Sequence, residues 1–126
     1  MVNKVILIGR VGKDPEARFT SGGEQTTGFS VATSEKWTAK DGQKQERTEW
    51  HRCEAWAKTA QIVSDYMVKG SLVYVEGKIR YEEWTDKEGH KRNATKIRAE
   101  RVMILGDGKP REKTQTQGDE DDEVPF

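Results

Sequence analysis

With 126 residues, 35% of them charged and 33% hydrophobic, the chain is long enough for one domain with a modest core. Its longest apolar run near the N-terminus, residues 5–8, is too short for a membrane span or a secretory signal. A single cysteine, Cys53, excludes an internal disulfide framework. The formal net charge is zero. We therefore expect a cytoplasmic protein.

The first half of the chain alternates in the manner of β-strands. Residues 4–11 predict a first strand, the turn residues of segment 14–23 predict a loop, and a second strand follows at about 27–34. The polar residues 38–46 predict a hairpin loop that leads into a third strand over 48–57.

One helical pattern follows, over residues 58–69, with Gly70 expected as its C-cap. A fourth strand is expected over 72–84 and, after a turn, a fifth over 93–105. Five strands with one helix between the third and the fourth is the order of the OB-fold, a Greek-key barrel that binds oligonucleotides. The predicted fold is therefore all-β with one short helix, in a domain over residues 1–106.

The pattern stops at residue 107. Residues 107–118 contain almost nothing to bury and predict a flexible linker, so we expect a disordered C-terminal tail. Residues 119–126 are an acidic run that ends in an apolar tip. A purely solvating tail has no use for a terminal Phe126, so the composition predicts a peptide that docks on a protein partner.

The charges divide between these two parts. Residues 1–106 hold 19 basic and 15 acidic side chains, a net charge of +4, whereas residues 107–126 hold 3 and 7, a net charge of −4. This asymmetry is typical of a body that faces nucleic acid and carries an acidic tail. A soluble domain with a solvating tail is the alternative on charge alone.

Strand alternation predicts where the tryptophans point. In the third strand, Trp50 and Trp56 share a face with Arg52, while His51 and Cys53 share the other. Aromatic rings interleaved with cations suit single-strand binding, because every base can stack and the cations neutralise phosphates. Burial at a subunit interface is the alternative for these rings.

The fourth strand repeats this arrangement. Trp84 falls on the same face as Lys78 and Arg80, and Trp37 lies among polar residues at the mouth of the hairpin loop. The opposite face predicts the core, and it consists of Val73, Val75, Gly77, Ile79 and Tyr81.

The chain resembles bacterial single-stranded-DNA-binding proteins along its whole length. The matching segments are residues 2–9, 14–16, 32–37, 48–52, 69–71, 73–77, 84–86 and the acidic Pro-Phe ending. The resemblance implies base stacking on Trp37, Trp50 and Trp84, and also on Trp56, where the family usually has phenylalanine. It further implies a homotetramer, with His51 and Tyr74 at its interface.

By the same resemblance, the protein works in the cytoplasm at the nucleoid, in DNA replication, recombination and repair. Helicases, an exonuclease and polymerase accessory subunits would then bind the tip. The partner-binding residues of the tip are expected to be Asp121, Asp122, Glu123, Val124, Pro125 and Phe126. The departure from the family is the short linker.

Catalysis finds little support in the residues. The carboxylates are scattered among lysines or lie in the tail, so a nuclease metal site is not expected. His51 and Cys53 are two zinc-type ligands without a second pair. Residues 9–13 have the wrong spacing for a phosphate loop. We expect a binding protein without cofactor or metal; an adaptor of the same fold would lack the acidic tip.

Overall fold

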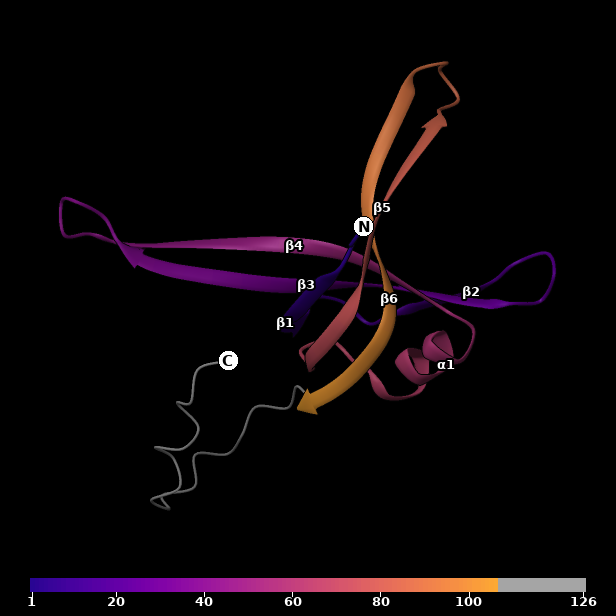
Figure 1. The fold of residues 1–126 in the computed structure, drawn as a ribbon, viewed down its shortest axis with the longest axis horizontal. Coiled ribbons are helices and arrows are strands. Elements are labelled where there is room, and N and C mark those ends of the chain that lie inside the picture. Colours follow the sequence, from indigo (N-terminus) through magenta and orange to yellow (C-terminus); the bar gives the residue numbers. More distant parts are fainter. Residues whose placement is uncertain (107–126) are drawn as a thin grey trace.

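The computed structural model describes residues 1–106, and the predicted linker and tip therefore lie outside the described residues. No helix in this part of the chain is long and apolar enough to cross a membrane. Figure 1 shows the elements, which are β1 (Val5–Val11), β2 (Glu16–Phe19), β3 (Gln25–Thr38), β4 (Lys44–Trp56), α1 (Ala57–Tyr66), β5 (Leu72–Thr85) and β6 (Lys91–Gly106).

Five of the strands close into a barrel. They are paired in the order β1-β5-β6-β4-β3, and β3 returns to pair with β1. The β4–β6 pair is parallel and all other pairs are antiparallel. Helix α1, which connects β4 to β5, packs against β3, β4 and β6. This is the topology that the sequence predicts.

The core follows the alternation of the strands. Its fully buried side chains include Val31, Val73 and Val75 from the strands and Val63 from α1. The buried Thr27 hydroxyl donates to the carbonyl of Ala60 at 2.9 Å, which ties β3 to the helix. Cys53 and Ala55 are buried, as expected for the inner face of β4.

Two ribbons continue beyond the barrel. One is formed by the ends of β3 and β4, and the other by the ends of β5 and β6, which project in a different direction (Figure 1). Because the β3–β4 pairing persists from Thr26–Trp56 to Thr38–Lys44, the loop expected over 38–46 shrinks to residues 39–43. The ribbons are exposed on both faces.

A bulge between Glu76 and Gly77 shifts the β5–β6 register close to where this ribbon begins. A β-carbon on Gly77 would lie 2.0 Å from the carbonyl oxygen of Arg98, so only glycine allows the two backbones to approach so closely.

Three expectations need correction. The segment expected as a loop contains β2, whose four residues are all exposed and so show no alternation. The helix ends at Tyr66 with Met67 as its C-cap, and Gly70 lies in the following turn with φ +89°. Tyr81 is 78% exposed instead of buried, because β5 has left the barrel at that point.

Candidate nucleic-acid interface

The outer face of β4 carries two of the tryptophans. Its register with β3 is uninterrupted, so alternation holds along the whole strand. Trp50, Arg52, Glu54 and Trp56 therefore point away from the barrel interior, on the side opposite Cys53. This agrees with the expected faces of the third strand.

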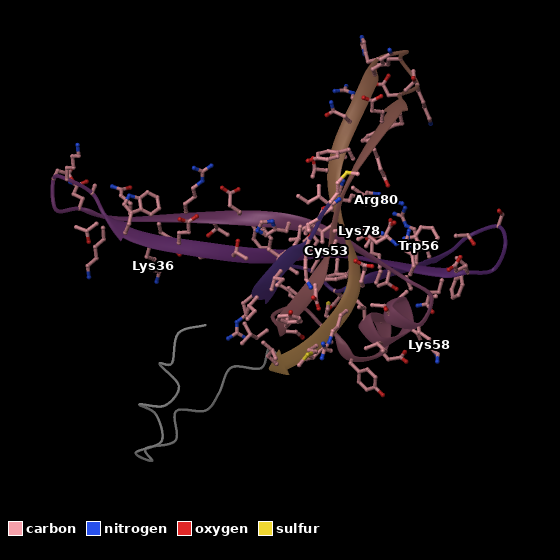
Figure 2. All side chains as sticks on the ribbon, viewed as in Figure 1. Lys36, Cys53, Trp56, Lys58, Lys78 and Arg80 are labelled. Carbon is pink, nitrogen blue, oxygen red and sulfur yellow. The ribbon has the colours of Figure 1, made fainter. Side chains whose placement is uncertain are left out.

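The β5–β6 ribbon continues this outer face. Lys78 pairs with Arg98 and Arg80 pairs with Lys96, so each pair lies on one side of the ribbon. The parallel register of Glu54 with Arg98 joins that side to the outer face of β4. Trp56, Lys78 and Arg80 are marked in Figure 2 close to where the strands leave the barrel.

We call this surface the cationic face. Its aromatic and basic residues are Trp50, Trp56, Trp84, Arg52, Lys78, Arg80, Lys96 and Arg98, and the same alternation places Glu54 and Glu82 on it. Lys96 and Arg98 are additions, because the sequence reasoning did not divide the faces of the fifth strand. The alternation Lys96-Ile97-Arg98-Ala99 carries that signal, since Ile97 and Ala99 are buried.

The rings on the cationic face are accessible. Trp50 is 62% exposed and Trp84 is 46% exposed, while Trp56 is half-buried. Trp37 is 47% exposed, but its register position opposite Gln45 places it on the other face of the β3–β4 ribbon from Trp50. Alternation thus places three of the tryptophans on the outer face, whereas Trp37 lies on the opposite face of the β3–β4 ribbon.

Trp56 is held by polar neighbours. Its indole Nε1–H donates to Glu54 Oε1 at 2.9 Å, and the guanidinium of Arg98 lies 4.9 Å from the ring centroid in a cation–π contact. Lys96 Nζ lies 3.5 Å from Glu54 Oε2 and 3.0 Å from Glu82 Oε2. One lysine thereby compensates two carboxylates beside the ring.

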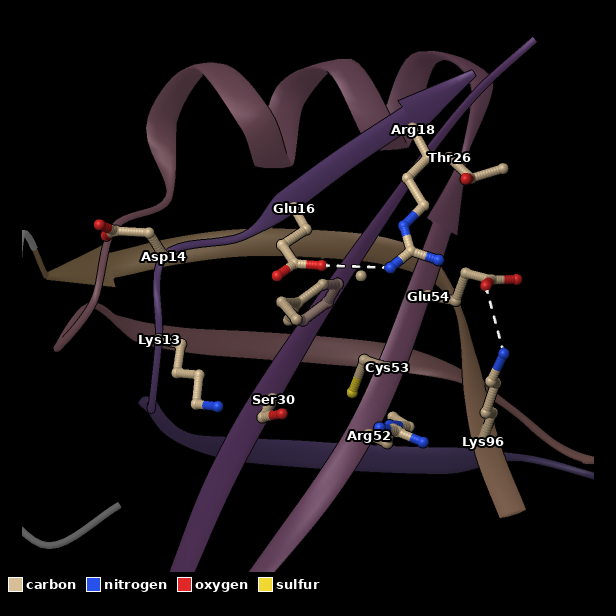
Figure 3. A pocket seen from close by; sticks show the side chains of 12 residues that line it. Lys13, Asp14, Glu16, Arg18, Thr26, Ser30, Arg52, Cys53, Glu54 and Lys96 are labelled. Carbon is tan, nitrogen blue, oxygen red and sulfur yellow. Dashed lines mark hydrogen bonds and ion pairs between the residues drawn. The ribbon is translucent and has the colours of Figure 1, made fainter. Parts of the chain in front are cut away.

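The other four cations of the cationic face form no ion pair with a described residue. Within residues 1–106, no carboxylate lies within ion-pair distance of Arg52, Lys78, Arg80 or Arg98. Arg52 also lines a hollow of about 330 Å³ between β2, β3 and β4, together with Lys13 (Figure 3). Cations that lack a protein counterion are suited to binding phosphates, because no internal ion pair must first be broken.

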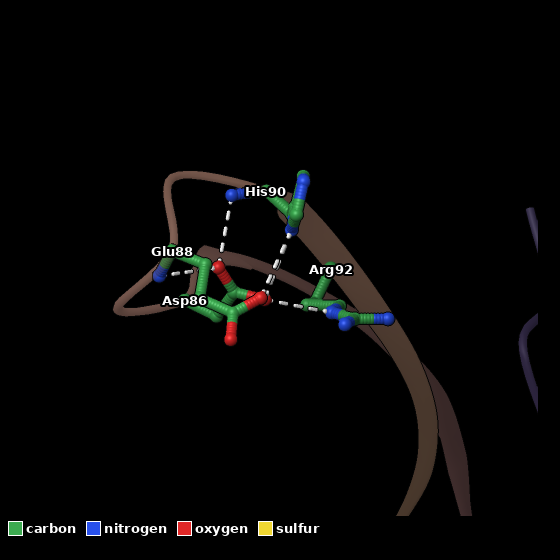
Figure 4. A network of polar contacts seen from close by, with 4 residues as sticks. All are labelled: Asp86, Glu88, His90 and Arg92. Atoms are coloured by element: carbon green, nitrogen blue, oxygen red, sulfur yellow. Dashed lines mark hydrogen bonds and ion pairs between the residues drawn. The ribbon is translucent and has the colours of Figure 1, made fainter.

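A polar network orders the turn that follows Trp84 (Figure 4). Asp86 Oδ1 accepts hydrogen bonds from the backbone N–H groups of Glu88 at 3.0 Å and His90 at 2.9 Å, and Asp86 Oδ2 accepts from Arg92 Nε at 3.0 Å. These contacts, led by the His90 backbone hydrogen bond, hold the pKa of Asp86 below its usual value. Because Arg92 pairs with Trp84, the network stiffens the hairpin that presents this ring.

Asp86, Glu88 and His90 bring ligand atoms within 4.8 Å of one another. Their contacts are those of a closed turn, since the Asp86 oxygens already accept three hydrogen bonds and His90 Nδ1 lies 3.6 Å from Glu88 Oε2. We assign the cluster a structural role.

The inward side of β4 carries His51 and Cys53, and neither side chain is free to act as a metal ligand or a nucleophile. His51 Nε2 forms a 2.8 Å hydrogen bond with Thr33 Oγ1, and burial raises the pKa of the Cys53 thiol to about 12. A thiol with so high a pKa stays protonated, so it is a poor nucleophile and a poor metal ligand. Tyr74 lies elsewhere, half-buried on the outer side of β5, opposite Ile8 and Met103.

The barrel is closed by five strands and has a helix between its third and fourth strands. One outer face carries tryptophans and cations, most of which have no carboxylate partner within residues 1–106. These features define an OB-fold of the kind that binds oligonucleotides. The model of the single-strand binding protein family matches residues 2–105. The chain belongs to this family.

Individual relatives support the same family membership. The chain is 49% identical over 105 residues to the single-stranded DNA-binding protein of Neisseria meningitidis serogroup A, covering 83% of this chain and 60% of that protein. It is 43% identical over 133 residues to single-stranded DNA-binding protein 1 of Xylella fastidiosa, covering 99% of this chain and 98% of that protein. The chain thus spans about three fifths of the Neisseria relative but nearly all of the Xylella one.

Solved structures confirm the OB-fold. Plasmodium falciparum SSB in complex with ssDNA superposes with a TM-score of 0.78 at 29% identity, over 83% of this chain and 96% of that one. A deletion mutant of the single-stranded DNA-binding protein from Thermus aquaticus gives a TM-score of 0.73 at 33% identity, over 82% of this chain and 50% of that one.

Proposed function

We propose that the chain binds single-stranded DNA without sequence preference and protects it during replication, recombination and repair. The observation that carries the proposal is the cationic face, which combines accessible rings with cations. Apart from Lys96, these cations have no carboxylate partner within residues 1–106. Ring faces accept any base, and phosphates are the same at every step, so such a surface is indifferent to sequence. Membership of the family supports the same conclusion.

Intrinsic tryptophan fluorescence tests this function. Titration with oligo-dT should quench the emission strongly, because bases would stack on exposed indoles, and a blunt duplex of equal length should quench it far less. Equal quenching by duplex and single strand would contradict the proposal. An enzyme is the rival class, and loss or shortening of the oligonucleotide during the titration would favour it.

The tail has a separate proposed role, which is to recruit genome-maintenance proteins through residues 119–126. Residues 107–126 have a net charge of −4, whereas residues 1–106 have a net charge of +4. This difference supports weak competition between the tail and DNA for the cationic face. Deleting residues 119–126 should leave DNA affinity equal or slightly higher at low salt, and should abolish recruitment. Phe126→Ala should strongly reduce recruitment and leave the electrostatic effect of the tail on DNA binding unchanged. Retained partner binding after the deletion would refute the docking role.

We also propose that the protein is a homotetramer with His51 and Tyr74 at its interfaces. An apolar surface on the outer side of β1 and β6 supports self-association, since Ile6 is 56% exposed, Met103 is 43% exposed and both flank the β5 strand that carries Tyr74. Light scattering at micromolar concentration tests the proposal, and a monomeric mass would overturn it.

A further inference from the structure

A carboxylate lies within the cationic face, where its negative charge opposes the binding of phosphates. Glu54 is on the outer side of β4, between Arg52 and Trp56 on the same face, and its side chain is 28% exposed. It lines two hollows of the surface, of about 330 Å³ and 410 Å³. The binding of a polyanion does not by itself explain an acid at this position.

Lys96 compensates the charge of Glu54. Its Nζ lies 3.5 Å from Glu54 Oε2 (Figure 3) and 3.0 Å from Oε2 of Glu82 on the β5–β6 ribbon. The Glu82 side chain is the more exposed of the two acids, at 45%. Glu54 and Glu82 thus share one cation, and they differ in their other contacts.

Glu54 also holds the edge of the Trp56 indole. Its Oε1 accepts a hydrogen bond from the indole Nε1–H at 2.9 Å, while the guanidinium of Arg98 lies over the ring at 4.9 Å from its centroid. A DNA phosphate would compete with the ring for Arg98, because a charge-assisted hydrogen bond is stronger than an exposed cation–π contact. The hydrogen bond to Glu54 takes no part in this competition, so it still fixes the ring after Arg98 has turned to a phosphate.

We infer that Glu54 is a positioning residue, which fixes the indole of Trp56 for stacking on a base while Lys96 limits the repulsion between the carboxylate and DNA. A ring that is already ordered loses less conformational entropy when a base stacks on it. The role depends on a tryptophan at position 56, because phenylalanine has no N–H to donate. The inference rests on the proposed function and deepens it, since it assigns a role to an acid on the proposed DNA surface.

Glu54→Ala and Glu82→Ala form a matched pair of variants. Each removes one negative charge and one partner of Lys96, but only Glu54→Ala removes the hydrogen bond to Trp56. Glu82→Ala should bind oligo-dT more tightly than the parent at low salt, and the gain should fade as salt rises. Glu54→Ala should bind at least about three-fold more weakly than Glu82→Ala, the effect of one side chain that must be ordered on binding.

Glu54→Gln provides the conservative rescue. It keeps an acceptor for the indole without the charge, so it should recover the affinity that Glu54→Ala loses. All three variants should unfold at the parent temperature, because neither acid belongs to the core. A folded Glu54→Gln that binds as weakly as Glu54→Ala would contradict the inference.

The same comparison in a Trp56→Phe background separates positioning from any other effect of Glu54. The difference in affinity between Glu54→Ala and Glu82→Ala should vanish there, since phenylalanine cannot donate the hydrogen bond. In NMR spectra, the indole N–H signal that Trp56→Phe removes should shift in Glu54→Ala and stay in place in Glu82→Ala.

The outcomes distinguish the inference from the proposed function. If the parent binds oligo-dT, but the two alanine variants bind equally or differ by the same factor in both backgrounds, the inference is wrong and the proposed function stands. If the parent itself does not bind oligo-dT, both fail.

Discussion

The ring of Trp50 occupies the space that a side chain on residue 12 would need. A β-carbon built on Gly12 would lie 2.3 Å from Cζ3 of Trp50, well inside van der Waals contact. The indole therefore rests on the backbone that follows β1, and it is supported there while remaining 62% exposed. A ring fixed in this way loses little conformational entropy when a base stacks on it.

Gly12→Ala should accordingly weaken DNA binding without unfolding the protein. The added methyl displaces a side-chain ring and leaves the backbone in place, so we expect a stability loss of at most about 1.5 kcal/mol, the cost of an off-rotamer side chain. Oligo-dT affinity and quenching should both fall. Gly22→Ala is the control, because a β-carbon there meets nothing closer than 3.9 Å. Equal DNA affinity in both variants would show that the support of Trp50 is irrelevant.

Arg98→Ala should reduce the salt dependence of binding. If Arg98 leaves Trp56 to neutralise one phosphate, its loss should lower the slope of log K against log salt by about 1. Affinity should fall similarly for oligo-dT and oligo-dC. Lys58→Ala, on the exposed first turn of α1 and outside the set of residues that form the cationic face (Figure 2), should leave the slope unchanged. An unchanged slope in Arg98→Ala would remove Arg98 from the interface.

The stability of the hairpin that carries Trp84 should depend on pH through Asp86. Because hydrogen bonds lower its pKa in the folded protein, the carboxylate stabilises the hairpin above the ordinary aspartate pKa, and this contribution is lost as the pH falls through the lowered value. Amide NMR signals of Glu88 and His90 should report the transition. Asp86→Asn keeps an acceptor for the backbone and should loosen the turn less than Asp86→Ala. Identical spectra in acid and at neutral pH would contradict this.

Ala57 offers a test of local strain. It follows Trp56 with φ +53°, in the left-handed region that disfavours any residue with a β-carbon, and its side chain is exposed. Ala57→Gly should raise the free energy of unfolding by up to about 1 kcal/mol, since the relief of strain outweighs the extra freedom of glycine in the unfolded chain. Denaturant titration measures the change, and a less stable variant would argue against this conformation.

The fold could be predicted from the sequence where strands alternate over a buried core. Val73, Val75, Cys53 and Ala55 fall on the expected inner faces because the barrel buries one side of each strand. β2 could not be found in this way, since it pairs only with β3 and exposes all four residues. Alternation also predicts wrongly that Tyr81 is buried. It shows to which side of a strand a residue points, but it does not show where the strand leaves the barrel.

The candidate site was only partly accessible to the same reasoning. Trp50, Trp56 and Arg52 were grouped correctly, since they lie on one strand and the register has no bulge. The contribution of Lys96 and Arg98 depends on the parallel pairing of β4 with β6, which joins residues more than forty positions apart. No local pattern specifies such a pairing.

Binding of single-stranded DNA along the cationic face is tested most directly by the oligo-dT affinity of Trp50→Ala and Trp84→Ala. Each variant should lose about 1–3 kcal/mol of binding free energy, the range typical of single-strand-binding OB-folds including this family. The losses should be similar for oligo-dC, and both proteins should remain folded by circular dichroism. Parental affinity in both folded variants would contradict the account.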